Sequence, residues 1–177
     1  MKISVIVAYH DEKNYIRDCL GSLADQSFRD FEVIMICDGC DKPDVSEWNG
    51  LQIHFARTKD TSGVAAARNA GLDTATGEYI FFMDADDYLA PDTLQRLVEK
   101  EVPGGVAYGE IRSTWYSRKV YFDNGEELDR QNGTEHTKYE GDVGNAYEYL
   151  PMRAGSLQGI TILGMLISRK VIQEHSI

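Results

Sequence analysis

Residues 79–87 read YIFFMDADD, an apolar stretch of strand length that runs directly into three carboxylates. A buried strand that delivers acids to its own carboxyl end is how α/β proteins build metal and phosphate sites. Asp84 and Asp86 are two residues apart, so on an extended chain both side chains leave the same face and could together hold one divalent cation. The Asp-x-Asp pattern is weak evidence by itself, because 16 aspartates in 177 residues produce roughly 1.4 such matches by chance. The segments around it must therefore decide the fold.

Apolar stretches of strand length alternate with helical patterns over the first hundred residues. Strands are expected at residues 2–8, 31–37, 51–56 and 79–83, with helices after the first strand, from near Gly63, and from near Pro91. This alternation predicts an α/β, doubly wound, mostly parallel sheet. The alternation weakens after Gly105, where expected strands at 106–111 and 114–122 would make the sheet mixed. An apolar stretch at 160–168 then precedes a further helix.

Composition and charge favour one cytoplasmic domain that does not bind nucleic acid. A chain of 177 residues suits a single compact core. The net charge of −11, without a basic run, would repel DNA or RNA, although a ligand with phosphates could still bind through a metal or a helix N-terminus. No apolar run approaches the roughly 20 residues of a membrane span, no signal peptide precedes the first strand, and three cysteines fit a reducing compartment.

Polar residues follow each expected strand at the point where it ends. His10 and Glu12 follow the first strand, Asp38 follows the second, and the acids from Asp84 onward follow the fourth. Arg68 lies on the helix that begins near residue 63. Because ligands of open α/β sheets bind outside the carboxyl ends of the strands, one nucleotide-sized crevice could collect all of these side chains.

Four ordered motifs resemble family 2 glycosyltransferases of the GT-A fold. They are HDE at 10–12, LADQSFRDFE at 23–32 followed by DG at 38–39, G63 with ARNAG at 67–71 and ATGEYI at 75–80, and DADD at 84–87. The resemblance is strong over about residues 2–100 and weak beyond. It implies a Rossmann-like, doubly wound single domain. Residues 1–100 would form the half that binds the nucleotide-sugar, and residues 101–177 the acceptor-side part, incomplete at its C-terminus.

The resemblance also implies a hexosyltransferase-type enzyme that is inverting and metal-dependent. It would move a sugar from a nucleotide-diphospho-sugar, most often a UDP-sugar, to the hydroxyl of a saccharide or lipid-linked saccharide, as in surface polysaccharide synthesis. Peripheral association with the inner face of the membrane would fit such an acceptor. The implied donor-binding residues are Ala8, His10, Glu12, Asp38, Gly63, Arg68, Asp84 and Ala85, and Asp86 would bind Mn²⁺ or Mg²⁺.

Individual roles follow from the same resemblance. Asp38 would accept a hydrogen bond from the uracil edge, His10 would pack on the base, and Asp84 would contact the ribose. Arg68 would face the phosphates, and Asp86 would hold the cation that neutralises the departing diphosphate. Plainer interpretations stay open: a capped Asp-Gly turn, a packed edge histidine and an ordinary surface arginine.

The chain departs from the family pattern at two positions. Ala8 replaces the usual proline after the first strand, and Cys37 replaces the first aspartate of an Asp-Asp-Gly triplet. The second change creates a Cys-x-x-Cys sequence with Cys40. No second cysteine pair or nearby histidine completes a zinc site, and no thioredoxin-type sequence surrounds the pair, so a buried structural cysteine is favoured for Cys37.

The catalytic base is not identified by these motifs. Inverting transfer needs a carboxylate that takes the proton of the acceptor hydroxyl, and in this family it usually lies in a Glu-Asp-type motif near the start of a late helix. Residues 164–172 resemble the segment before that motif, so we expect a C-terminally truncated sequence whose base lies beyond Ile177. Asp87 and Glu110 are weaker candidates.

Two rival functions and one unassigned segment remain. A nucleotidyltransferase has a similar sheet but would carry a glycine-rich loop after the first strand, where this chain has YHDE at 9–12. A donor-binding module without catalysis of its own is the other alternative. Residues 123–142 hold seven acids against two basic residues, which predicts a polar surface segment, or alternatively an acceptor-side lid.

Overall fold

The computed structural model describes residues 2–59, 62–100, 105–108, 111–113, 135–137 and 164–175. Its centre is a six-stranded sheet with the order β3-β2-β1-β4-β8-β5. The strands are β1 (Ile3–Tyr9), β2 (Phe31–Cys37), β3 (Ile53–Arg57), β4 (Tyr79–Asp84), β5 (Val106–Tyr108) and β8 (Met165–Ser168). The first four run parallel, whereas β8 is antiparallel to both β4 and β5. The predicted mostly parallel, mixed sheet is confirmed.

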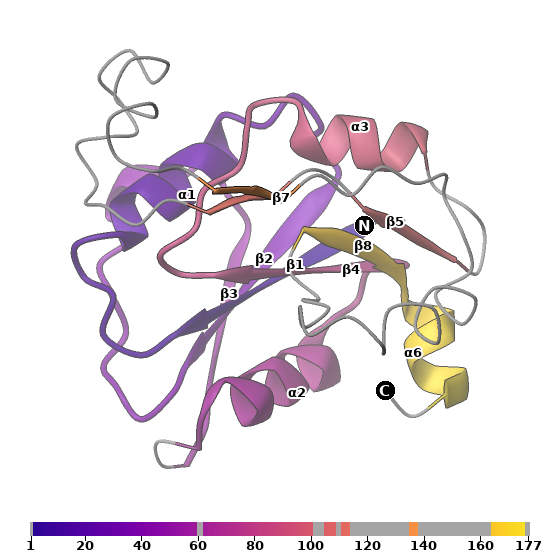
Figure 1. Cartoon of the computed structure of the whole chain (residues 1–177). Coiled ribbons are helices and arrows are strands. Elements are labelled where there is room, and N and C mark those ends of the chain that lie inside the picture. Colours follow the sequence, from indigo (N-terminus) through magenta and orange to yellow (C-terminus); the bar gives the residue numbers. More distant parts are fainter. Residues whose placement is uncertain are drawn as a thin grey trace.

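Helices cover both faces of this sheet, as the doubly wound prediction requires. The helices are α1 (Ile16–Ala24), α2 (Val64–Thr74), α3 (Thr93–Glu99) and α6 (Arg169–His175), with a 3₁₀ turn η1 at Ser46–Trp48. Figure 1 shows α1 and α3 on one side of the sheet and α2 and α6 on the other. Two separate apolar clusters fill the layers between the sheet and these helices.

Strand β1 lies in the middle of the sheet and is apolar on both faces. Val5 and Val7 belong to the apolar cluster beneath α1 and α3, whereas Ile6 belongs to the cluster beneath α2. Successive side chains of a strand point to opposite faces, so a strand covered by helices on both sides is apolar at nearly every position. This is why the first strand reads as an apolar run that only Ser4 interrupts.

Helix α2 packs against β1 through small residues on its inward face. Its buried positions are Ala67 and Gly71. A Cβ atom added to Gly71 would overlap the side chain of Ile6, so a larger residue would force Ile6 or the helix to shift. Arg68 lies one turn earlier on α2, so this packing also sets how far Arg68 stands from the sheet.

The start of α3 is held by a residue from the segment after α1. Gln26 is fully buried, and its Oε1 accepts a hydrogen bond from the backbone N–H of Leu94 at 3.0 Å. Its Nε2 donates to the carbonyls of Ser22 and Ala90 at 3.0 and 2.7 Å. One amide therefore satisfies an N–H of the first helical turn and ties α3 to α1.

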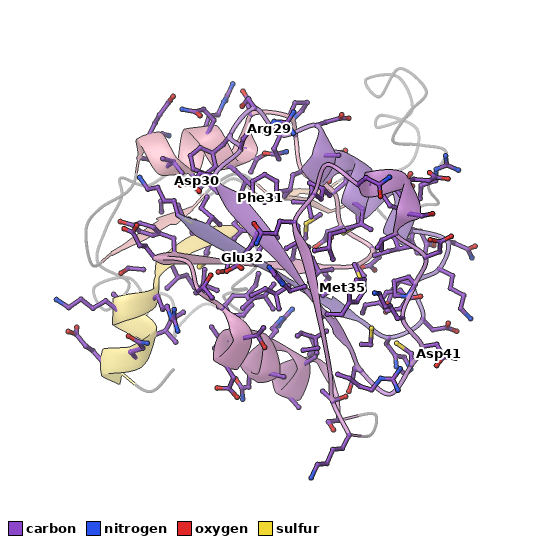
Figure 2. All side chains as sticks on the ribbon, turned by 180° about the vertical axis from the view of Figure 1, so that it is seen from behind. Arg29, Asp30, Phe31, Glu32, Met35 and Asp41 are labelled. Atoms are coloured by element: carbon purple, nitrogen blue, oxygen red, sulfur yellow. The ribbon has the colours of Figure 1, made fainter. Side chains whose placement is uncertain are left out.

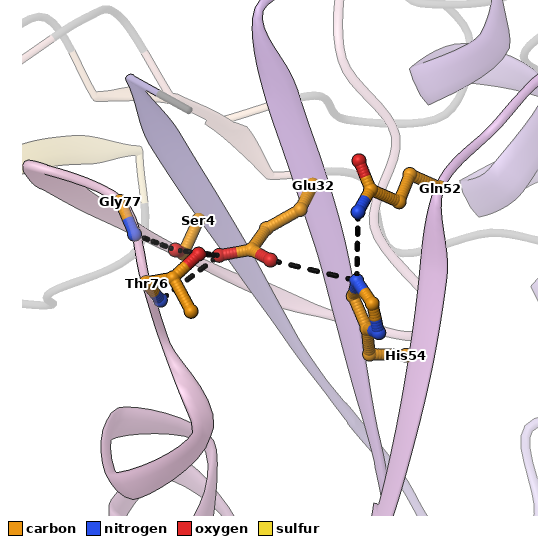
Figure 3. A network of polar contacts seen from close by, with 6 residues as sticks. All are labelled: Ser4, Glu32, Gln52, His54, Thr76 and Gly77. Atoms are coloured by element: carbon orange, nitrogen blue, oxygen red, sulfur yellow. Dashed lines mark hydrogen bonds and ion pairs between the residues drawn. The ribbon is translucent and has the colours of Figure 1, made fainter.

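A polar network closes the amino end of the sheet, at the opposite end of β2 from Asp41 (Figure 2). Glu32 is only 3% exposed, and its Oε1 accepts hydrogen bonds from Ser4 Oγ at 2.6 Å and from Thr76 N and Oγ1 at 2.9 and 2.7 Å. Ser4 Oγ in turn accepts from Gly77 N at 2.8 Å, and His54 lies 3.6 Å from the other carboxylate oxygen (Figure 3). The network joins β1, β2, β3 and the turn before β4.

Burial by itself would raise the pKa of Glu32. The hydrogen bonds from Ser4 and Thr76, together with the nearby His54, outweigh that effect and hold the pKa below its usual value. The buried charge is thereby paired, so this carboxylate stabilises the fold while it is ionised.

Three predicted elements differ from the structure or lie outside it. The single strand expected at 106–111 is wrong: β5 pairs with β8 in the main sheet, whereas β6 (Ile111–Ser113) pairs with β7 (Glu135–Thr137) in a separate two-stranded sheet. Strand β3 begins at Ile53 rather than at residue 51. The strand expected at 114–122 and most of the acidic segment 123–142 lie outside the described residues.

Within the described part of the chain, no helix combines the length and the apolar character that crossing a bilayer would require.

Candidate functional site

A cavity of about 320 Å³ opens at the carboxyl ends of β1, β2 and β4, beside the first turns of α2. It gathers eight of the residues predicted for the donor or the metal, namely Ala8, His10, Glu12, Asp38, Arg68, Asp84, Ala85 and Asp86. The sequence reasoning missed Tyr9, Val64 and Ala67, which also line it. The helical period after Gly63 would have indicated the last two, because residues 64, 67 and 68 share one face of a helix.

Asp38 has a structural role that the sequence did not predict. Its Oδ1 accepts hydrogen bonds from Thr58 Oγ1 at 2.5 Å and from Ser62 N at 2.8 Å, and its Oδ2 accepts from Gly63 N at 2.9 Å. The bond from Thr58, followed by the backbone donors, holds the pKa of Asp38 below its usual value. A carboxylate has about four acceptor sites, so Oδ2 keeps one lone pair for a ligand.

Gly63 is the one residue predicted for donor binding that is not part of the cavity lining. Its backbone N–H is engaged by Asp38, and its φ of 85° is a conformation that residues with a side chain rarely adopt. It is the N-cap of α2 and immediately precedes Val64, which lines the cavity. The glycine therefore lets the chain turn so that Asp38 and α2 come together.

His10 and Glu12 form one ordered loop after β1. Glu12 Oε2 accepts hydrogen bonds from the backbone N–H groups of His10 at 2.7 Å and of Asp11 at 3.1 Å. His10 Nδ1 lies 2.6 Å from the carbonyl oxygen of Asp38. Because a carbonyl only accepts, Nδ1 must carry the proton in this contact, which leaves Nε2 of the neutral ring as an acceptor. The imidazole is thus fixed in orientation beside Asp38.

Arg68 and Asp84 form an ion pair across the cavity wall. Arg68 Nη2 lies 2.7 Å from Asp84 Oδ1, and the arginine side chain is only 19% exposed. Among the described residues, Arg68 Nε is a buried side-chain nitrogen without a hydrogen-bond partner. An unpaired buried donor is costly, and an anionic ligand oxygen would satisfy it. The arrangement argues against an ordinary surface arginine.

The acids after β4 differ in their surroundings. Partial burial and the neighbouring charges of Asp84 and Glu12 raise the pKa of Asp86, which lines the cavity. Loss of hydration and the charges of Asp84 and Asp86 raise the pKa of Asp87 to about 6, and Asp87 is not part of the lining. Glu110, the other weak candidate for a base, lies outside the described residues.

A divalent cation fits this donor set if the ligand completes the coordination. Among the described residues no three His, Cys, Asp or Glu side chains form a ready metal cluster. Mg²⁺ is usually bound by only one or two carboxylates together with substrate phosphates and water. Asp86, with Asp84 and Glu12 on the same cavity, supplies the negative charge that such a cation would neutralise.

Comparison with known proteins identifies the family. The model of "Glycosyl transferase family 2" matches residues 4–174 of this chain. The chain belongs to glycosyl transferase family 2. The expected family is thereby confirmed.

Relatives within glycosyl transferase family 2 are considerably longer than this chain. Glycosyltransferase GlyA of Streptococcus pneumoniae is 30% identical over 129 residues, which are 68% of this chain and 18% of GlyA. The structure of S. aureus TarS 1–349 in complex with UDP-GlcNAc matches with a TM-score of 0.52 and 34% identity, covering 56% of this chain and 30% of the TarS 1–349 chain.

A second solved structure is the mannosyltransferase PcManGT from Pyrobaculum calidifontis in complex with GDP-Man and Mn²⁺. It matches with a TM-score of 0.54 and 27% identity, covering 59% of this chain and 34% of PcManGT. Together the two structures confirm the expected GT-A fold.

Proposed function

We propose that this chain is the donor-binding region of an inverting, metal-dependent glycosyltransferase that uses a UDP-sugar and transfers the sugar to a hydroxyl of a saccharide or lipid-linked saccharide. The observation that carries the proposal is the single cavity that collects Asp38, Arg68, Asp84 and Asp86. Its volume of about 320 Å³ falls in the range of small-molecule sites. From family membership we also propose that the transfer serves the synthesis of a surface polysaccharide.

The nucleotide end of the donor would lie at the end of β2. Asp38 Oδ2 keeps an acceptor site that the N3–H of uracil can fill, and His10 is held beside it by the Asp38 carbonyl. Both groups are fixed in place before any ligand arrives, which reduces the entropy that binding must overcome. The UDP-GlcNAc complex of TarS, at 34% identity, supports a uridine nucleotide.

The diphosphate would lie between α2 and the end of β4. Arg68 Nε would donate to a phosphate oxygen while Nη2 keeps Asp84 in position. Asp86 would ligate Mn²⁺ or Mg²⁺, which supplies charge neutralisation for the departing diphosphate. The Mn²⁺ complex of PcManGT supports such a cation. Residues 1–100 are thus proposed as the donor half and residues 101–177 as the acceptor-side part.

Calorimetry tests this proposal. UDP, GDP and dTDP are titrated with and without Mn²⁺, and we expect UDP to bind best and to bind more tightly with Mn²⁺. Asp86→Ala should remove the effect of Mn²⁺. Asp73→Ala is the matched control, because Asp73 is an exposed acid at the far end of α2. The proposed site would be contradicted if the affinity for UDP were the same with and without Mn²⁺, or if Asp86→Ala did not change the effect of Mn²⁺.

A further inference from the structure

Cys37 and Cys40 stand on either side of Asp38 and Gly39 in the sequence, and both lie beside Tyr9 at the end of β1. Cys37 ends β2 and is only 2% exposed, whereas Cys40 is partly exposed, and both thiols are free. The chain bends between them at Gly39, whose φ is 68°. The bend brings the Cys40 thiol to 3.4 Å from the carbonyl oxygen of Tyr9, which is also the residue that pairs with Cys37 in the register of β1 and β2. Side chains of cysteines three residues apart across a bend can form a disulfide.

This pair shares its hydrogen-bond partners with the cavity. The carbonyl of Tyr9 accepts both from the Cys40 thiol at 3.4 Å and from the backbone N–H of Asp38 at 2.8 Å. The carbonyl of Asp38 holds the His10 ring at 2.6 Å. A change in the loop between the two cysteines therefore acts on the backbone of Asp38 and, through it, on the position of His10.

We propose that Cys37 and Cys40 are a redox-modifiable pair whose disulfide closes the loop around Asp38 and weakens binding of the nucleotide. The inference rests on the proposed function for its effect on binding, but not for the disulfide itself. With a small-molecule disulfide as oxidant, both thiols lose their protons, one S–S bond forms between Cys37 and Cys40, and the S–S bond of the oxidant is reduced to two thiols. Oxidation removes the S–H donor to Tyr9 and restrains the backbone on both sides of Asp38.

Exposure determines which thiol reacts first. Cys40 is the more accessible of the two, and Cys37 then completes the exchange from within the fold. Burial, the neighbouring Cys37 and the carboxylates of Glu12 and Asp11 raise the pKa of Cys40 to about 11. Little thiolate is present at neutral pH, so the exchange is slow there and needs long incubation.

The experiment treats the full 177-residue chain with oxidised glutathione and maps the cysteines by peptide mass spectrometry. We expect a Cys37–Cys40 disulfide, two hydrogens lighter than the dithiol, with Cys19 left free because it is fully buried. Calorimetry should show UDP binding about tenfold or more weaker, the size expected from losing one hydrogen bond to a charged group, and dithiothreitol should restore it.

Two variants separate the possible outcomes. Cys40→Ser keeps a donor near Tyr9 and should bind UDP normally with or without oxidant, whereas Cys19→Ala should respond like the unmodified sequence. The inference is overturned if no Cys37–Cys40 disulfide forms, if UDP binds equally to both forms, or if Cys40→Ser also loses affinity on oxidation. Absence of UDP binding to the reduced protein instead contradicts the proposed function, and the mass measurement still decides whether the disulfide forms.

Discussion

Replacing Asp38 by asparagine should lower the stability of the fold and also weaken the binding of UDP. The two effects arise from different hydrogen bonds of the carboxylate. The amide oxygen can keep the hydrogen bonds from Thr58 and Ser62, but the new NH₂ group then faces the N–H of Gly63, which bonds to Oδ2 at 2.9 Å in the native protein. Two donors cannot bond to each other. The uracil N3–H would meet the same NH₂ group.

The size of the effect follows from the bonds that are lost. One hydrogen bond to a charged group contributes about 1.5–3 kcal/mol, and the Gly63 N–H is left without its partner. Asp38 lines a cavity that water can enter, so we take the lower end, about 1.5–2 kcal/mol of unfolding free energy. For a domain of this size the melting temperature should fall by roughly 3–8 °C.

Thermal unfolding followed by circular dichroism measures the first effect, and calorimetry with UDP measures the second. Thr58→Val removes one bond to Asp38 but keeps the carboxylate, so it should lower stability by about 0.5–1.5 kcal/mol and leave most UDP binding intact. Asp41→Asn is the matched control, because its exposed side chain reaches Arg57 only at 3.8 Å. If the Asp38→Asn variant had the same melting temperature as the native protein, the anchoring role of this carboxylate would be refuted.

Three further predictions concern other parts of the described structure. Gly77→Ala should destabilise the protein by about 1–3 kcal/mol in urea unfolding, because the added Cβ would lie 2.7 Å from the backbone nitrogen of Ser4; unchanged stability would contradict the packing. Because the pKa of Glu32 is lowered, its carboxylate stabilises the fold above pH 4.5, the ordinary pKa of glutamate, and this stabilisation is lost as the pH falls below that value. Glu32→Gln should therefore make the free energy of unfolding depend less on pH in the acid range. Arg68→Met should weaken UDP binding about tenfold or more through the lost phosphate contact, whereas Arg96→Met, on the exposed face of α3, should not; equal affinities would exclude Arg68 from the phosphate site.

Much of the fold could be predicted from local patterns. The nearly continuous apolar runs of β1, β2 and β4 and the stripe of Ile16, Cys19, Leu20 and Leu23 on α1 were sufficient, because burial on one or both faces imposes a period that the sequence must show. The strand expected at 106–111 could not be resolved in this way. Val106–Tyr108 pairs with β8, whereas Ile111 begins β6 and pairs with β7, and pairing depends on segments distant in the sequence.

The hydrogen-bond partners of several polar residues could likewise not be predicted from local sequence patterns. Glu32 and Gln26 both lie in the 23–32 motif, yet each acts on residues more than forty positions away, on Thr76 and on Leu94. A sequence shows that a polar residue stands at a given position but not which donor reaches it. Those partners are decided when the helices pack onto the sheet.

The α/β class, the family and the position of the polar residues at the strand ends could all be inferred from the amino-acid sequence, because each of these follows from local spacing and from motifs. Three contacts depend on the packed structure: Asp38 anchors the start of α2, Arg68 pairs with Asp84 while its Nε has no partner, and the Cys40 thiol reaches the carbonyl of Tyr9 beside Cys37. The physical reason is that hydrogen bonds and ion pairs depend on distances of a few ångströms between residues that only the packed sheet and helices bring together.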